Sequence, residues 1–164
     1  MSDLASQYQG DVLQLVSFVI AEEEFGVDIL KVQEIIRPPE ITRVPNAPSF
    51  VEGVINLRGR IVPIVDLRAR FGLPPREQDK DTRIVVVELE EQVTGFQMDA
   101  VKEVIRVEQD VIEPPPELAI GIDTDYLKGV AKLEERLLIL LDLEEVLSEN
   151  ELIDMAEATE PVSA

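Results

Sequence analysis

The sequence predicts a mainly β protein made of two small barrels, and three observations lead to this fold class. Residues 12–20 and 84–89 are rich in Val, Ile and Phe and partly alternate, which is typical of strands. Each tract is followed by a short charged turn and a second strand, so each begins a hairpin. A longer segment then occurs twice along the chain. About five short strands in each copy is the number expected for a small closed barrel.

The repeat aligns residues 51–67, VEGVINLRGRIVPIVDL, with residues 127–143, LKGVAKLEERLLILLDL, without a gap. Gly53 coincides with Gly129, and nearly all the core positions match apolar for apolar. An internal repeat of this kind indicates two copies of one supersecondary unit. A glycine within a strand usually marks a bulge or a close approach of two backbones. We therefore expect the glycine pair to serve the fold.

The match extends upstream, where residues 25–37 correspond to residues 96–106 if a two-residue gap is allowed. Each copy then contains a hairpin, a connection with prolines, a second hairpin and a short helix. We predict two interleaved barrel subdomains within one domain, at approximately residues 12–80 and 81–150.

Both copies end in a short helix, the second of them near the C-terminus. Asp66 precedes LRARF and Asp142 precedes LEEVL, so each carboxylate can accept hydrogen bonds from the first amides of a helix. A catalytic role is the alternative, but occurrence in both copies favours the cap. Outside the domain, which spans residues 12–150, we expect residues 1–11 to be flexible and residues 151–164 to form an acidic, disordered tail.

Composition argues against most enzyme classes. The chain has no His and no Cys, which removes the commonest general base, the commonest transition-metal ligand and every thiolate. We expect no catalytic residue, no cofactor and no metal site. A small-molecule-binding β-barrel or a carboxylate-based hydrolase remains as an alternative function, since glycosidases work with carboxylates alone.

Charge and hydropathy indicate where the protein acts. A net charge of −19 repels nucleic-acid phosphates and anionic lipids, so neither nucleic acid nor a membrane is an expected partner. The N-terminus lacks the basic and apolar regions of a secretory signal. The apolar runs are far shorter than the roughly 20 residues needed to span a bilayer. We predict a cytoplasmic protein.

Arg58 is the clearest candidate for a binding residue. It lies in NLRG, at a hairpin turn that Gly59 explains structurally, but the corresponding residue of the second copy is Glu134. The shared fold therefore does not require the arginine. A guanidinium at a turn is suited to pair with a carboxylate of a partner, while the alternative is a solvated charge.

Two further features are candidate surfaces. Glu34 lies beside Val32, Ile35 and Ile36, which form an apolar patch if they point outward and part of the core if they point inward. Five arginines also cluster in the first copy and either create a locally positive face or balance nearby acids. They are Arg58, Arg60, Arg68, Arg70 and Arg76.

The runs FGVDILKVQEII, ITRVPNAP and FVEGVINLRGRIVPIVDLR closely resemble the CheW coupling proteins of bacterial chemotaxis. The resemblance covers the chain from Val12 to about Ser148. It implies two five-stranded SH3-like β-barrels and a non-catalytic adaptor that couples the histidine kinase CheA to the cytoplasmic tips of methyl-accepting chemoreceptors. The length of 164 residues leaves no room for the kinase or receiver domains of related proteins, so we expect the free adaptor.

The resemblance also implies where partners bind. In the family, one barrel pairs with the homologous regulatory domain of CheA, and a groove between the barrels receives the helical hairpin tip of the receptor. By motif position, the partner-binding residues are Val32, Glu34, Gly53 and Arg58. Arg58 and Gly53 are expected mainly to contact the receptor, and Glu34 with Val32 the receptor or the kinase.

Overall fold

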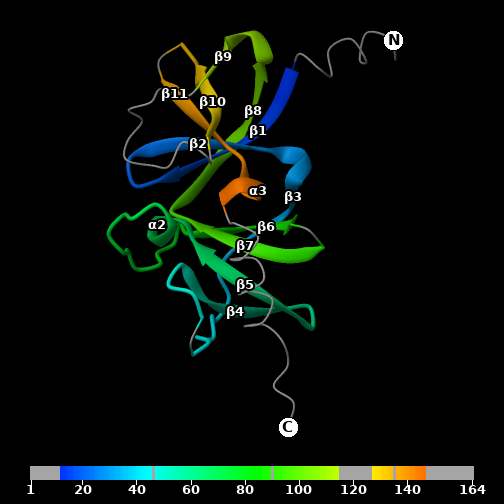
Figure 1. Ribbon diagram of the computed structural model, residues 1–164, viewed down its shortest axis with the longest axis vertical. Helices are drawn as coiled ribbons and strands as arrows, with labels where there is room; N and C mark the ends of the chain where they lie inside the picture. Colours follow the sequence, from blue (N-terminus) through cyan, green and yellow to red (C-terminus); the bar gives the residue numbers. More distant parts are fainter. Residues whose placement is uncertain (1–11, 46, 90, 115–126, 135, 147–164) are drawn as a thin grey trace.

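The structure is a computed structural model in which the chain forms two strongly curved β-sheets stacked one above the other (Figure 1). The predicted flexible N-terminus and acidic tail, residues 1–11 and 151–164, lie outside the residues that it describes. Among the described residues, no helix has both the length and the apolar character needed to cross a membrane. The described residues are 12–45, 47–89, 91–114, 127–134 and 136–146.

The upper sheet of Figure 1 has the strand order β8-β1-β2-β11-β10-β9. Its strands are β1 (Val12–Ile20), β2 (Glu23–Asp28), β8 (Ala100–Glu108), β9 (Ile112–Glu113), β10 (Leu127–Lys132) and β11 (Leu137–Leu141). Only the 3-10 helix η2 (Gln109–Val111) separates β8 from β9, although these strands form opposite edges. One bent segment thus occupies both edges and closes the sheet into an upper barrel, which has five strands when β8 and β9 are counted as one.

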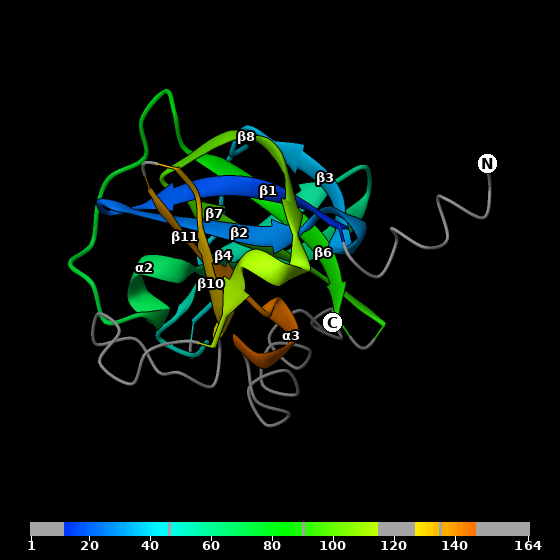
Figure 2. The same ribbon diagram turned by 90° about the horizontal axis from the view of Figure 1, so that it is seen from above.

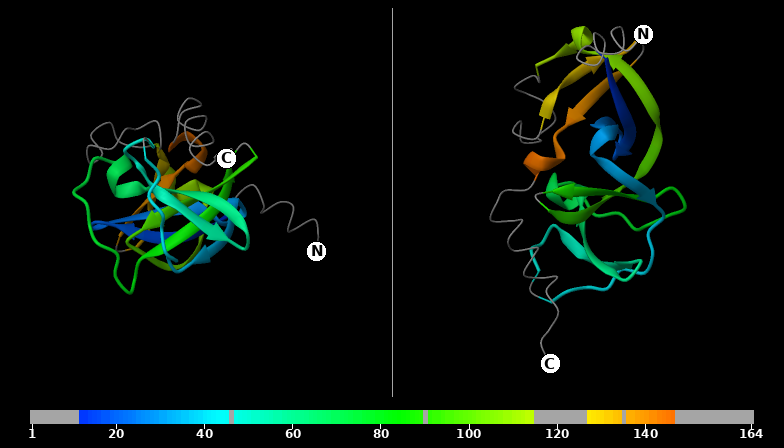
Figure 3. Two further views of the ribbon diagram at one scale, coloured as in Figure 1. Left: turned by 90° about the horizontal axis from the view of Figure 1, so that it is seen from below. Right: turned by 90° about the vertical axis from the view of Figure 1, so that its right-hand side faces the viewer.

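The lower sheet has the order β3-β6-β7-β5-β4. Its strands are β3 (Val32–Ile36), β4 (Val51–Leu57), β5 (Arg60–Asp66), β6 (Arg83–Leu89) and β7 (Gln92–Met98). Thr42, downstream of edge strand β3, pairs with Val54 of the opposite edge through hydrogen bonds of 2.9 and 2.8 Å. The same device therefore closes a lower barrel, and the predicted fold class of two five-stranded barrels is confirmed (Figure 3).

The barrels do not follow the predicted division at residue 80. Hairpin β1–β2 joins the upper barrel with strands of the second copy, whereas hairpin β6–β7 joins the lower barrel with strands of the first copy. Each exchanged hairpin pairs in parallel with a strand of the other copy. In β2, Phe25 lies opposite Ile139 of β11, and in β7, Phe96 lies opposite Val65 of β5. The ranges 12–80 and 81–150 thus describe the repeat and not the barrels. Periodicity shows which face of a hairpin is buried but not which copy covers it.

Three apolar clusters hold this arrangement together. Each barrel has an aliphatic interior, and the largest cluster lies where the barrels meet. In this central cluster the ring centroid of Phe25 lies 5.7 Å from that of Phe18 and 5.7 Å from that of Phe71. Full burial of one large apolar side chain stabilises the fold by about 1.5–3 kcal/mol. Because the central cluster draws on strands of both barrels, the barrels form one body. Figure 2 shows this stacking from above.

The two short helices end their repeats as predicted. In α2 (Leu67–Arg70), Asp66 accepts a hydrogen bond of 3.0 Å from the amide of Arg68. In α3 (Leu143–Val146), Asp142 accepts one of 3.0 Å from the amide of Glu144. Both aspartates therefore act as helix caps.

The repeated glycines allow two backbones to approach closely. The register shifts beside Gly53 in β4 and beside Gly129 in β10. A Cβ at Gly53 would lie 2.3 Å from the carbonyl oxygen of Thr42, and one at Gly129 would lie 2.7 Å from that of Glu113. The predicted fold role of the pair is confirmed, since these contacts occur where each barrel closes.

We predict that Gly53→Ala destabilises the fold by about 1–3 kcal/mol, the usual cost of overpacking. The added methyl group would meet a backbone oxygen that cannot move without breaking the Thr42–Val54 bridge. Gly129→Ala should cost less because its closest contact is longer. Thermal melts measure both effects, with Ser49→Ala, an exposed neighbour, as the control. Equal stability of Gly53→Ala and the wild type would contradict the prediction.

We also predict that Thr94→Val stabilises the lower barrel by about 1 kcal/mol. Thr94 is fully buried on β7, and its hydroxyl has no hydrogen-bond partner among the described residues. The matched control is Thr82→Val, because the buried Thr82 hydroxyl accepts a hydrogen bond of 2.9 Å from the amide of Asp79. Thr82→Val should therefore be destabilising. Urea denaturation measures the free energy of unfolding of both variants. A loss of stability in Thr94→Val would refute the prediction.

Candidate functional site

The tight turn between β4 and β5 displays Arg58. Both central residues have left-handed backbones, with φ of 53° at Arg58 and 84° at Gly59, as in a type I′ hairpin turn. The amide of Gly59 donates a hydrogen bond of 2.8 Å to the Asn56 side chain. Glycine suits this geometry, whereas arginine adopts it at a cost. The Arg58 side chain is 71% exposed.

An ion pair with Glu34 orients Arg58. The carboxylate of Glu34 accepts a hydrogen bond from Nη2 of Arg58, which raises the pKa of the guanidinium. Glu34 lies on β3 and Arg58 at the end of β4, so the pair joins opposite edges of the lower sheet. An exposed ion pair adds little stability. Its effect is to hold a guanidinium whose other donors can reach a partner.

The apolar residues around Glu34 divide between core and surface. Val32 is half-buried and packs against the central cluster, and Ile36 packs against the lower interior. Ile35 points outward, 39% exposed, and Ile61 near the same turn is 49% exposed. We call Glu34, Ile35, Arg58 and Ile61 the lower patch. It consists of the ion pair and of two exposed apolar residues, one next to Glu34 on β3 and one in the β4–β5 hairpin that carries Arg58. Gly53 is buried, so the four residues predicted from sequence do not form one exposed surface.

Four of the five clustered arginines have contacts within the fold. Besides the pair of Arg58 with Glu34, Arg68 forms an ion pair of 2.6 Å with the buried Asp99, and Arg76 pairs with Asp79 at 2.7 Å. For these three the alternative of balance by nearby acids agrees with the structure. Arg70 instead donates a hydrogen bond of 2.8 Å to the carbonyl oxygen of Val146 and lies over the ring of Phe50. Arg58 and Arg60 are exposed at the turn.

A second surface on the upper barrel was missed by the sequence analysis. Arg136 lies 3.1 Å from Glu103 and 3.4 Å from Glu24, beside two exposed apolar residues, Val104 (52%) and Leu137 (58%). Glu103 is the repeat counterpart of Glu34, and Leu137 that of Ile61. We call Glu103, Val104, Arg136 and Leu137 the upper patch. The repeat could have revealed three of its four members, which correspond to Glu34, Ile35 and Ile61, whereas Arg136 corresponds to Arg60 and not to Arg58.

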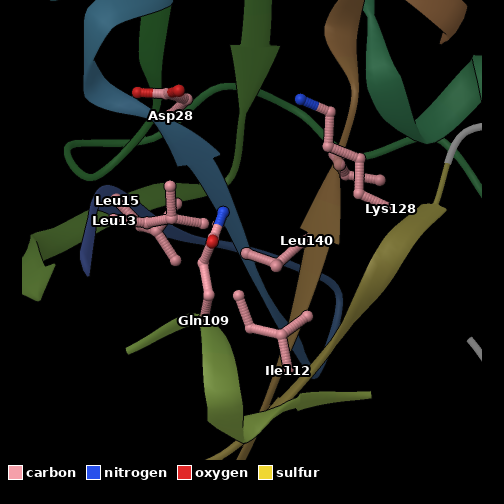
Figure 4. A pocket seen from close by; sticks show the side chains of 9 residues that line it. Leu13, Leu15, Asp28, Gln109, Ile112, Lys128 and Leu140 are labelled. Carbon is pink, nitrogen blue, oxygen red and sulfur yellow. The ribbon is translucent and has the colours of Figure 1, made fainter. Parts of the chain in front are cut away.

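A cavity of about 260 Å³ opens on the upper barrel (Figure 4). Leu13, Leu15 and Leu140 form part of its apolar floor, while Asp28 and Lys128 lie on opposite sides of it. Helix η1 (Ile29–Lys31) follows Asp28 and carries Leu30, which is 87% exposed. The cavity is lined by the upper barrel alone, whereas the groove expected from sequence lies between the barrels.

Comparisons with known proteins agree with this architecture. A family model described as CheW-like domain matches residues 14–151. Chemotaxis protein CheW of Klebsiella aerogenes is 41% identical over 93% of this chain and 90% of its own length. The Helicobacter pylori protein of the same name is 41% identical, with 85% and 84% covered. The crystal structure of the scaffolding protein TtCheW from Thermoanaerobacter tengcongensis matches with a TM-score of 0.78 and 42% identity, covering 85% of this chain and 94% of that one. The chain belongs to the CheW family of chemotaxis coupling adaptors.

Proposed function

We propose that this protein acts in the cytoplasm, where it couples the histidine kinase CheA to methyl-accepting chemoreceptors and catalyses no reaction. The observation that carries the proposal is that each barrel has an ion pair with exposed apolar side chains next to its members in the sequence. Exposed apolar residues next to charged groups are typical of protein interfaces. A protein with two such patches on one body can hold two partners at once.

The lower patch is the proposed receptor contact. Arg58 offers donors for a receptor carboxylate, and Glu34 fixes its orientation. Gly53 contributes through the backbone, because the Thr42–Val54 bridge that it permits sets the position of β4 and of the turn. Val32 contributes in the same indirect way by anchoring β3 in the central cluster, next to Glu34.

The receptor tip is a helical hairpin, and its apolar side chains also need a place on the adaptor. Leu30 and the cavity beside Asp28 offer one on the upper barrel, close to where the chain crosses to β3. An amphipathic helix can insert an apolar residue into this cavity while its polar residues form hydrogen bonds or ion pairs with Asp28 and Lys128. This contact would extend the receptor site beyond the lower patch.

The upper patch is the proposed contact with the regulatory domain of CheA. Leu137 and Val104 are the most exposed apolar residues of the two patches, which favours a partner that buries them for long periods. A barrel of the same family would offer a matching surface. One such contact is small, so strength would come from many linked partners in an array, which raise the effective concentration.

The barrel interiors argue against the alternative of a small-molecule-binding barrel or a carboxylate-based hydrolase. That function requires acids directed into a barrel, but the interior clusters of both barrels are aliphatic. They consist of Leu15, Val107, Ala131, Leu138 and Leu140 above, and of Ile55, Val62, Ile64, Ile84, Val86 and Val93 below.

We predict that Arg58→Ala weakens receptor binding about fivefold or more while the melting temperature stays nearly constant. The side chain is 71% exposed, so its loss should affect a partner more than the fold. Pull-down on receptor fragments and kinase activation assays provide the measurement. Arg60→Ala removes an exposed arginine from the same turn and serves as the matched control. Undiminished receptor binding by Arg58→Ala would exclude Arg58 from the site.

A second variant separates the two surfaces. We expect Val104→Asn combined with Leu137→Asn to reduce binding to CheA by about tenfold, because both apolar side chains would lose their burial at the interface. Receptor binding should persist. Titration calorimetry with each isolated partner measures both affinities, and Ile35→Asn with Ile61→Asn is the matched control on the lower patch. Equal loss toward both partners would argue against separate faces.

A further inference from the structure

The lower barrel carries two carboxylates where the upper barrel carries a cation and a carboxylate. Under the repeat, Glu52 corresponds to Lys128, and Asp66 corresponds to Asp142. The shared fold therefore accepts a positive charge at this position. The like-charged pair in the lower barrel is a property of one copy and not a requirement of the architecture.

The pair lies at a surface cavity of about 490 Å³. Glu52, Asp66 and Arg76 line it, together with residues 43–45 and 47–49, which precede β4. Oε2 of Glu52 is fully buried and has no hydrogen-bond partner among the described residues. Burying a carboxylate oxygen that accepts no hydrogen bond costs much more free energy when the carboxyl group is ionised than when it is protonated. This atom is hence the natural position for a proton.

The cations near the pair offset its negative charge only in part. Burial raises the pKa of the Glu52 carboxyl and the charge of Asp66 raises it further, while Arg43 and Gln97 act in the opposite direction. Burial also raises the pKa of Asp66, against the amides of Arg68 and Ala69 and the Arg68 guanidinium, and the charge of Asp99 adds to the rise.

Two other cations near the cavity already have a partner. Arg68 and Arg76 both contact Asp99, at 2.6 and 3.3 Å. Asp66 caps helix α2, a role that its ionised form performs best because it accepts from backbone amides. The proton of the pair therefore belongs on Glu52.

We propose that Glu52 and Asp66 form a proton-linked latch, in which protonated Glu52 keeps residues 43–45 and 47–51, which line the same cavity or adjoin it, packed on the lower barrel and loss of the proton loosens them. The folded protein binds this proton more tightly than the unfolded chain does. The latch therefore contributes its full stability at acid pH and loses it as the pH rises through the folded-state pKa of Glu52, above the ordinary value of 4.5. Residues 43–45 and 47–51 adjoin the Thr42–Val54 bridge that closes the barrel.

The test compares Glu52→Gln with Glu40→Gln, which removes the same charge from an exposed position nearby. Melting temperatures are measured between pH 4 and pH 8. We expect Glu52→Gln to melt about 2 °C or more above the wild type at pH 7.5, with the difference disappearing toward pH 4, and Glu40→Gln to show no such pH-dependent gain. Trypsin should also cleave after Arg43 more slowly in Glu52→Gln at pH 8. A difference that is constant with pH, or that Glu40→Gln reproduces, would overturn the latch.

A measurement on the unaltered protein does not depend on how a variant folds. The side-chain carboxyl carbon of Glu52, followed by NMR in the full chain, should titrate above the ordinary glutamate pKa of 4.5. Glu52→Lys, which places the residue of the upper barrel at this position, should raise the melting temperature at pH 7.5 as Glu52→Gln does. Titration of Glu52 at or below that ordinary pKa would refute the proposal whatever the variants show.

Discussion

The parallel pairing of each exchanged hairpin with the other copy is the constraint on which the rest of the structure depends. β2 pairs with β11, and β7 pairs with β5, so neither barrel closes with strands from one copy alone. The central aromatic cluster then lies between strands that are distant in sequence. Non-local pairing of this kind closes long loops and is cooperative. Each barrel therefore needs strands of both copies, and a fragment ending near residue 80 would lack the β6–β7 hairpin of the lower barrel.

The sequence predicts local features of this fold better than its connectivity. Hairpins, helix caps and the glycine pair follow from residues whose chemistry acts on near neighbours, as Asp66 does on the amide of Arg68. The exchange of hairpins depends on which apolar face meets which, and Val and Ile are equally suited to either copy. The same limit explains the sites. Arg58 differs from Glu134, its counterpart in the repeat, whereas Leu137 is apolar like its counterpart Ile61, so the repeat does not show that it is 58% exposed.

One body with two patches has consequences for an adaptor. The patches are on different barrels, and the shared core prevents the barrels from moving independently. A partner bound to one barrel therefore has a defined orientation relative to a partner bound to the other. Under the proposed function, coupling would need no conformational change in the adaptor, because a rigid body fixes the relative orientation of its two partners. Flexibility would weaken this effect, since it would let each partner reorient separately.

The turn that carries Arg58 shows how function departs from the demands of the fold. Among the described residues of the two corresponding turns, Arg58 has a positive φ and Glu134 does not. Glycine would relieve the left-handed conformation at Arg58, as Gly59 does at the next position. The ion pair with Glu34 is exposed and holds the guanidinium without adding much to stability. The positive φ of Arg58 and its exposed ion pair are therefore what the proposed receptor contact would explain, since the fold itself requires neither.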